Sequence, residues 1–239
     1  MTPQEFFMKA RARLLGEKTR WMRIESRFVV QFLRHFDVDC VFDVGANEGQ
    51  YALRLRRAGF KGTIISFEPH PGMTRILKSR AAGDPRWIVI ERALDSVAKE
   101  TTFNVSEQSE MSSLHSPTLE GETRFWNGLH DQRSITIQTT TLDAIFLDLR
   151  TEHGFRRPFL KLDTQGHDME VVRGGAAVMN DFVGLQSELA FTKLYENSPD
   201  YAQSLAFYQS LGFKISGLLP NNEGHFPDLL EMDCIMYRV

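Results

Sequence analysis

Residues 41–59, VFDVGANEGQYALRLRRAG, decide the fold class. A short apolar run ends at Asp43, a turn that contains Gly45 and Gly49 follows, and an amphipathic segment begins at Gln50. A strand, a glycine turn and a helix in this order open a βαβ unit, and such folds bind ligands outside the carboxyl ends of their parallel strands. The glycines allow a tight turn and the close approach of a ligand. We therefore expect an α/β domain with a nucleotide-type cofactor at this turn.

The rest of the chain continues this rhythm, because short β-branched or aromatic runs alternate with segments of helical period. The pattern predicts strands at 40–44, 63–67, 87–91, 159–162 and 183–187, and helices at 50–58, 73–82, 142–149, 168–179 and 205–211. Residues 213–218 and 233–239 predict two more strands, joined by a connection rich in Pro, Asn and Gly. That hairpin would close a mostly parallel sheet with an antiparallel strand.

The overall composition excludes several classes of function. The chain has 239 residues, which fits one domain with an appendage, and its net charge of −3 provides no field that would hold a nucleic acid. The sequence contains no run of about 18 apolar residues, so we predict no membrane span. Cys40 and Cys234 lie in apolar runs, where thiols are usually buried, and so few cysteines fit a reducing cytoplasm. We expect a cytoplasmic protein without a nucleic-acid partner.

We expect residues 37–239 to form the main domain. Two segments of the chain differ in composition from the rest. Residues 1–36 carry eight Lys or Arg and three Glu, with apolar residues interleaved at helical spacing. They predict an amphipathic helical extension that packs on the main domain, with weak contact to a membrane surface or docking of a partner as the alternative. Residues 104–133 are polar and rich in Ser, Glu and Gly, and they predict a lid on the substrate side.

Side chains near the glycine turn separate the candidate cofactors. Asn47 stands where the dinucleotide fingerprint needs its second glycine, and Glu48 at the start of the helix would repel phosphates. S-adenosylmethionine has no phosphate and carries a sulfonium cation, so these residues favour it over NAD. Glu68 ends the next predicted strand, where a carboxylate accepts hydrogen bonds from both hydroxyls of a ribose. An NAD-linked oxidoreductase stays as an alternative.

Five ordered motifs carry a resemblance to a known family. VFDVGANEGQYAL (41–53), FEPHP (67–71), TTLD (140–143), FLKLDTQGHDMEVVRGG (159–175) and SEL (187–189) resemble the FkbM family of S-adenosylmethionine-dependent O-methyltransferases. The resemblance covers about residues 40–218. It implies a class I methyltransferase (Rossmann-like) fold, with a seven-stranded, mostly parallel sheet, helices on both faces and an antiparallel last strand. It also implies methyl transfer to a hydroxyl of a small molecule or a glycan, a sugar hydroxyl being preferred.

The resemblance also assigns the cofactor site. The methionine part of S-adenosylmethionine would lie against the turn after the first strand, the ribose against Glu68, and the adenine between Ala93 and Leu94. The turn residues are Asp43, Gly45, Ala46, Asn47 and Gly49. A non-catalytic docking module on the same fold is a further alternative, suggested by the basic residues of the segment 1–36.

The chemistry of methyl transfer points to residues at the carboxyl ends of the later strands. Transfer depends on holding the hydroxyl oxygen about 3 Å from the methyl carbon in a dry pocket, and a general base contributes about 10²–10⁴-fold. The resemblance places Asp163 beside the methyl group, and Asp163, His167 and Glu188 are the first candidates for the base. His167 departs from the family pattern, which usually has a small residue before the acidic one. Asp168 is a weaker candidate, because a carboxylate there also caps the next helix.

The polar segment adds candidate substrate contacts. MSSLHSP resembles a Ser-rich element that the family carries before its lid, so we expect Ser112, Ser113 and His115 to contact the substrate. Trp126 would stack on a sugar face or fill a local apolar cluster. We predict no metal site, because the carboxylates lack D-x-D-x-D spacing and no histidines cluster.

Overall fold

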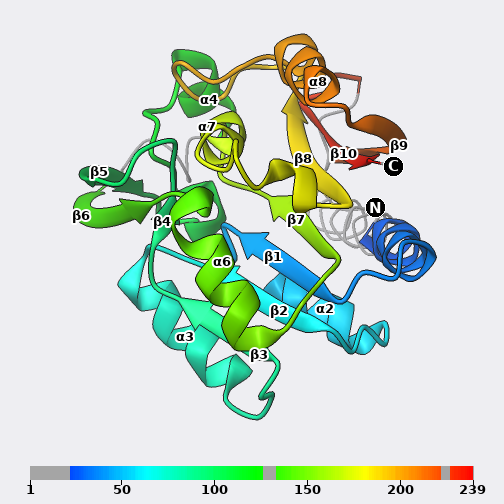
Figure 1. Ribbon diagram of the computed structural model, residues 1–239. Coiled ribbons are helices and arrows are strands. Elements are labelled where there is room, and N and C mark those ends of the chain that lie inside the picture. Colours follow the sequence, from blue (N-terminus) through cyan, green and yellow to red (C-terminus); the bar gives the residue numbers. More distant parts are fainter. Residues whose placement is uncertain (1–21, 126–132, 222–226, 239) are drawn as a thin grey trace, which may run out of the picture.

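A seven-stranded sheet with the order β3-β2-β1-β7-β8-β10-β9 organises the molecule (Figure 1). The computed structural model describes residues 22–125, 133–221 and 227–238. The strands are β1 (Cys40–Val44), β2 (Thr63–Phe67), β3 (Trp87–Ile90), β7 (Pro158–Leu162), β8 (Gly184–Ala190), β9 (Lys214–Asn221) and β10 (Glu231–Tyr237). The first five in this list pair in parallel, and β10 runs antiparallel to both β8 and β9. The predicted mostly parallel sheet with an antiparallel last strand is confirmed.

Helices cover both faces of this sheet because its central strands are apolar on both sides. In β1, Phe42 packs on the face covered by α6 (Leu142–His153), α7 (Asp168–Arg173) and α8 (Tyr201–Ser210). Val41 packs on the other face, against α2 (Gln50–Arg57), α3 (Pro71–Ala81) and a helix at 22–35. The carboxyl ends of the parallel strands, which carry the candidate site, therefore lie at one edge between two helical layers.

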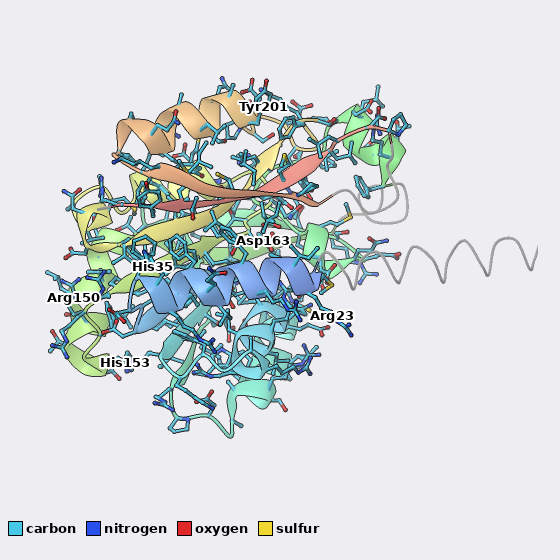
Figure 2. All side chains as sticks on the ribbon, turned by 90° about the vertical axis from the view of Figure 1, so that its right-hand side faces the viewer. Arg23, His35, Arg150, His153, Asp163 and Tyr201 are labelled. Carbon is cyan, nitrogen blue, oxygen red and sulfur yellow. The ribbon has the colours of Figure 1, made fainter. Side chains whose placement is uncertain are left out.

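The helix at 22–35 is part of the molecule's core. Val29, Phe32 and Leu33 are buried, and the ring centroid of Phe32 lies 5.3 Å from that of Phe159 on β7. Figure 2 faces this helix, which runs across the sheet between the labelled Arg23 and His35. Residues 22–35 thus pack on the sheet together with α2 and α3, while residues 1–21 of the predicted extension lie outside the described residues. No helix in the described ranges is long and apolar enough to cross a membrane.

The structure also contains a second, smaller sheet. It has the order β4-β6-β5, formed by β4 (Ala93–Leu94), β6 (Arg133–Thr140) and β5 (Glu100–Val105), and lies at the left in Figure 1. The polar segment then continues with the short helix η1 (Ser109–Met111) and with α4 (Leu119–Arg124). The described part of the predicted lid therefore has regular structure and starts inside a strand.

One predicted helix is wrong in its length. Helix α7 ends at Arg173 instead of continuing to residue 179, and a short helix, η2 (Met179–Asp181), follows. Asp143 accounts for the early end, since its backbone N–H donates to the carbonyl oxygen of Gly174 at 2.9 Å and its carboxylate accepts from the backbone N–H groups of Ala177 and Val178. Ala176, which helical spacing places on the buried face, is exposed.

The two cysteines are fully buried, as expected. Cys40 lies on β1 and Cys234 on β10, and both side chains belong to the core on the side of α6. Both are free thiols. Burial and the nearby charge of Asp39 raise the pKa of Cys40, and burial raises the pKa of Cys234 to about 12.

Candidate active site

A cavity of about 350 Å³ lies at the carboxyl ends of the parallel strands. It extends from Glu68 at the end of β2, past Asp163 at the end of β7, to Glu188 on β8 and Glu231 on β10. We call the part near Glu68 the donor end and the part near Glu188 the acceptor end. The volume falls in the range of about 300–1,000 Å³ that is typical of small-molecule sites.

The turn between β1 and α2 forms one wall of the donor end. Gly45 has a φ of 73°, and a Cβ atom on it would lie 1.9 Å from the backbone oxygen of Asp163. Asn47 also has a positive φ, 47°, and its backbone N–H donates to Oε2 of Glu68 at 2.8 Å. Its side-chain Oδ1 accepts from Ser109. Asn47 Nδ2 is buried and has no partner within the part of the chain that the structure describes.

Glu68 is held at the donor end by two backbone groups. Besides the bond from Asn47, its Oε1 accepts from the backbone N–H of His70 at 2.8 Å. Burial raises the pKa of Glu68 to about 7, although these two hydrogen bonds oppose the shift. Ala46, Ala93 and Leu94 add apolar surface to the same end. The donor end thus combines the carboxyl group of Glu68 and the amide nitrogen of Asn47, which has no partner among the described residues, with apolar surface.

Two of the expected cofactor residues do not line the cavity. Asp43 is fully buried beneath the turn, where it accepts a hydrogen bond from Ser66 at 3.1 Å. Gly49 has a φ of 86°, and a Cβ atom there would lie 2.7 Å from the side chains of Leu77 and Trp87. Both residues support the turn from behind, and neither lines the surface open to a ligand.

The expectation that Glu48 repels phosphates is weakened. Its carboxylate pairs with Arg80 at 2.7 Å, so its charge is largely balanced by the guanidinium. Glu48 is also not part of the cavity wall.

Lys161 connects the turn with the end of β7, a role that the sequence patterns did not predict. Its buried ammonium lies 3.3 Å from Asp43 and 3.3 Å from Asp163. It also lies 3.5 and 3.4 Å from the backbone oxygens of Val44 and Gly45. Burial opposes the charged form, but the two carboxylates raise the pKa of Lys161 above its usual value. A lysine inside the apolar run FLKL was the available signal, because such a charge is buried only when it is paired.

The acceptor end brings together Asp163 and Glu188, two of the three predicted candidates for the base. Gln165 Nε2 lies 3.1 Å from Asp163 Oδ1 and 3.3 Å from Glu188 Oε2. Glu188 also shares a hydrogen bond with Glu231, whose pKa burial raises to about 7 against the effect of that bond. A hydrogen bond between two carboxyl groups requires a shared proton. Gln165 lies inside the motif at 159–175 but was given no role, and Glu231 lies outside the motifs.

His167 occupies the cavity wall, but both of its ring nitrogens are engaged elsewhere. Nε2 lies 2.9 Å from Asp95 Oδ1, and Nδ1 lies 3.1 Å from His115 Nε2. Burial opposes ionisation of Asp95, but hydrogen bonds from Lys99, Ser96 and His167 hold its pKa below the usual range. The ionised Asp95 therefore makes Nε2 of His167 the donor. This arrangement suits a structural link better than a base.

The predicted substrate contacts separate into different groups. Ser112 lines the cavity, and its hydroxyl accepts from the backbone of Ser106. Ser113 is fully buried and donates to the backbone oxygen of Gln165 at 2.8 Å. His115 lies behind His167, and burial together with the charge of His167 lowers its pKa. Trp126 lies outside the described residues. Substrate contact by Ser112 stays a prediction.

Asp168 has a structural position. Its Oδ1 accepts from the backbone and hydroxyl of Thr164, and its Oδ2 accepts from Ser187 at 2.6 Å. These bonds close the loop before α7, and none of them goes to an N–H group of the helix itself, so the expected capping is not observed.

Comparisons with solved structures agree with the observed architecture. Magnesium protoporphyrin IX methyltransferase from Synechocystis PCC 6803, solved with bound S-adenosylmethionine, shares 10% sequence identity with a TM-score of 0.52, covering 95% of this chain and 84% of that chain. TehB from Haemophilus influenzae shares 8% (TM-score 0.48, 88% and 61% covered). Fibrillarin from Aeropyrum pernix shares 12% (TM-score 0.44, 83% and 66% covered). The likeness to the first shows the class I methyltransferase fold.

Comparison at the sequence level gives the family. No curated protein matches the chain. The model of the methyltransferase FkbM domain matches residues 43–215, a range that contains the glycine turn, Glu68, Asp163 and Glu188. The chain therefore belongs to the FkbM methyltransferase family.

Proposed function

We propose that this protein transfers the methyl group of S-adenosylmethionine to a hydroxyl group of a small molecule or a glycan, with a sugar hydroxyl as the preferred acceptor. One observation carries the proposal. A single cavity joins the carboxyl group of Glu68, at the position expected for a ribose, to the carboxylates Asp163 and Glu188. The cavity thus offers adjoining positions for the methyl donor and for the acceptor.

The residues of the donor end fit S-adenosylmethionine. Asn47 Nδ2 needs an acceptor, and Glu68 has lone pairs beyond its two backbone bonds for ribose hydroxyls. Ala93 and Leu94 offer apolar walls for the adenine. Gly45 keeps the turn against Asp163, so that the carboxylate lies next to the site of the cofactor. When bound, S-adenosylmethionine supplies an electrophilic methyl group on a cationic sulfur.

Among the candidates for the base, Glu188 is the best supported. Asp163 is engaged by the ammonium of Lys161 at 3.3 Å and by the amide of Gln165 at 3.1 Å. His167 has both nitrogens in hydrogen bonds. Glu188 lies at the cavity wall, 3.3 Å from the amide of Gln165, and shares a hydrogen bond with Glu231, through which a proton can pass between the two carboxyl groups. Glu188 would take the hydroxyl proton, and Asp163 would orient the hydroxyl.

The first test is calorimetric titration with S-adenosylmethionine, S-adenosylhomocysteine and NADH, each with and without magnesium. We expect micromolar binding of the first two alone. Tight binding of NADH would overturn the proposal in favour of an oxidoreductase. If none of the three compounds binds, the non-catalytic docking module is favoured.

The second test is a screen for labelled methyl transfer to panels of sugars, polyketide-type alcohols, amines and carboxylic acids. We expect transfer only to hydroxyl oxygens. Glu188→Gln should lower kcat by about 10²–10⁴-fold and leave the affinity for S-adenosylhomocysteine unchanged. Glu91→Gln, an exposed glutamate paired with Lys78, is the matched control. Methylation of amines alone would reject the hydroxyl acceptor.

A further inference from the structure

Gln165 lies in the loop between β7 and α7 and connects the two carboxylates of the acceptor end. Its Nε2 lies within hydrogen-bonding distance of Asp163 and Glu188, at 3.1 and 3.3 Å, and its Oε1 accepts from the hydroxyl of Tyr195 at 2.9 Å. An amide nitrogen carries two hydrogens, so each carboxylate can receive one. The side chain thus uses all of its donors at once.

These partners fix the orientation of the amide. Turning it over would place Oε1 against two carboxylate oxygens, which are acceptors only when ionised. The hydroxyl of the buried Tyr195 lies on the opposite side, 2.9 Å from Oε1 of Gln165 and 2.9 Å from the backbone oxygen of Met111, so its one hydrogen serves these two acceptors. The orientation of the amide is therefore fixed mainly by the two carboxylates.

The backbone of Gln165 is held as firmly as its side chain. Its φ is 53°, in the left-handed region that non-glycine residues rarely adopt. Its carbonyl oxygen accepts from the buried hydroxyl of Ser113 at 2.8 Å. The hydroxyl of Tyr195 also lies 2.9 Å from the backbone oxygen of Met111. The segment before α4 thus supports the unusual conformation that points the amide between the carboxylates.

We propose that Gln165 is a positioning residue, which fixes the separation of Asp163 and Glu188 through the amide that bridges them. The assignment of a catalytic effect rests on the proposed methyl transfer, whereas the bridging geometry does not. Nothing in the motif pattern required a glutamine at this place, and no step of the proposed chemistry uses its side chain directly.

A second unit of the same construction supplies an internal control. Gln186 Oε1 accepts from the hydroxyl of Tyr51 at 2.9 Å, and its Nε2 donates to Glu25 and Asp233, both at 3.1 Å. This unit joins the helix at 22–35 to β8 and β10, where Asp233 is the sheet partner of Glu188. Its amide donates to neither Asp163 nor Glu188, so changes to the Gln165 unit should move the signals of Gln186 less than those of Gln165.

The geometry is tested by nuclear magnetic resonance of the side-chain amides in the full chain saturated with S-adenosylhomocysteine. The signals of Gln165 are assigned by their loss in Gln165→Ala, and those of Gln186 by their loss in Gln186→Ala. We expect Asp163→Asn to move one amide proton of Gln165 upfield, Glu188→Gln to move the other, and Tyr195→Phe to move both. The signals of Gln186 should move less than those of Gln165. If Asp163→Asn and Glu188→Gln move the same proton, or neither, the bridge does not exist and the proposal is overturned.

The catalytic effect is tested by kinetics with the best acceptor from the screen. Gln165→Ala should lower kcat by at least about tenfold, with KM and the affinity for S-adenosylhomocysteine changed by less than about threefold. Gln165→Glu preserves the shape and adds a carboxyl group within 3.3 Å of the two others, so it should move the acid limb of the pH profile up by about one unit. A merely structural role would not move that limb, and an unchanged kcat and pH profile would overturn the proposal. If the wild type methylates no hydroxyl compound, the proposed function fails, while the resonance experiment still decides the bridge.

Discussion

The ammonium of Lys161 lies 3.3 Å from Oδ1 of Asp43, and both side chains are buried within the sheet. The two residues are direct neighbours in the parallel pairing of β1 and β7. Ser66, the neighbour of Asp43 on β2, completes a polar row with a hydrogen bond of 3.1 Å. The row lies under the turn that forms the donor end, so the position of that turn depends on a buried ion pair, of which Lys161 also lines the cavity.

Lys161→Met should destabilise the fold by about 3–5 kcal/mol, because it leaves Asp43 as a buried charge without its partner. Asp43→Asn in the same chain removes that charge, so the double variant should regain a large part of the loss. Denaturant unfolding of the two single variants and the double variant measures the coupling between the residues. Additive losses would contradict the pairing.

Glu68→Ala should weaken the binding of S-adenosylmethionine by about 10- to 150-fold, since charge-assisted hydrogen bonds contribute about 1.5–3 kcal/mol. Calorimetric titration measures the affinity. Glu68→Gln, which keeps the volume, separates lost recognition from any disturbance of the backbone groups of Asn47 and His70. An affinity like that of the wild type in both variants would reject the ribose assignment.

Gly45→Ala should cost far more stability than Gly154→Ala, although both positions have positive φ, 73° and 69°. A left-handed conformation alone costs about 1–2 kcal/mol for a residue with a Cβ atom. At residue 154 no described atom lies within 4 Å of the added methyl, whereas at residue 45 it meets the backbone oxygen of Asp163 at 1.9 Å. Thermal unfolding with and without S-adenosylhomocysteine compares the two. Equal losses would show that the close approach does not matter.

The stability of the ligand-free protein should fall between about pH 4.5 and pH 7, in part because of Glu68. Burial raises its pKa from 4.5 to about 7, so in this range the folded state keeps a proton that the unfolded state has lost. Raising the pH then favours unfolding, by up to about 3 kcal/mol for this group. Glu231 and Asp233, both with a pKa of about 7, act in the same direction.

The comparison with Glu68→Gln isolates this contribution. The variant should show a smaller loss of unfolding free energy over the same pH range, measured by urea denaturation. The other titrating groups cancel in the difference, including His115, whose lowered pKa acts in the opposite direction. A pH dependence that is equal in both proteins would contradict the raised pKa of Glu68.

The central strands were predictable because burial on both faces leaves little freedom of sequence. The bounds of β1 and β2 agree with the expected 40–44 and 63–67. Helix α7 was predicted too long, because its end depends on hydrogen bonds of Gly174, Ala177 and Val178 to the distant Asp143 that no local pattern contains. Helix α8 begins earlier than expected, at Tyr201, where Asp200 and Gln203 form a capping box.

The candidate site was predictable where one stretch of chain builds it. The glycine turn was predictable because it directly follows a strand, and Glu68 was predictable from its spacing to that turn. Gln165 and Glu231 were missed, because their roles arise only when loops and strands far apart in the sequence meet at one cavity. His167 shows the reverse case, since its chemistry suggested a base until its hydrogen bonds to Asp95 and His115 were seen.

Alkylation of the two buried thiols can report opening motions of the protein. Alkylation requires an exposed thiolate, and in the folded protein Cys40 and Cys234 are both fully covered and have raised pKa values. Labelling therefore proceeds only through excursions that separate the strands. Cys234 lies one strand from the edge strand β9, whereas Cys40 lies on β1 in the middle of the order. The order in which the two react distinguishes peeling of the terminal hairpin from opening of the whole sheet.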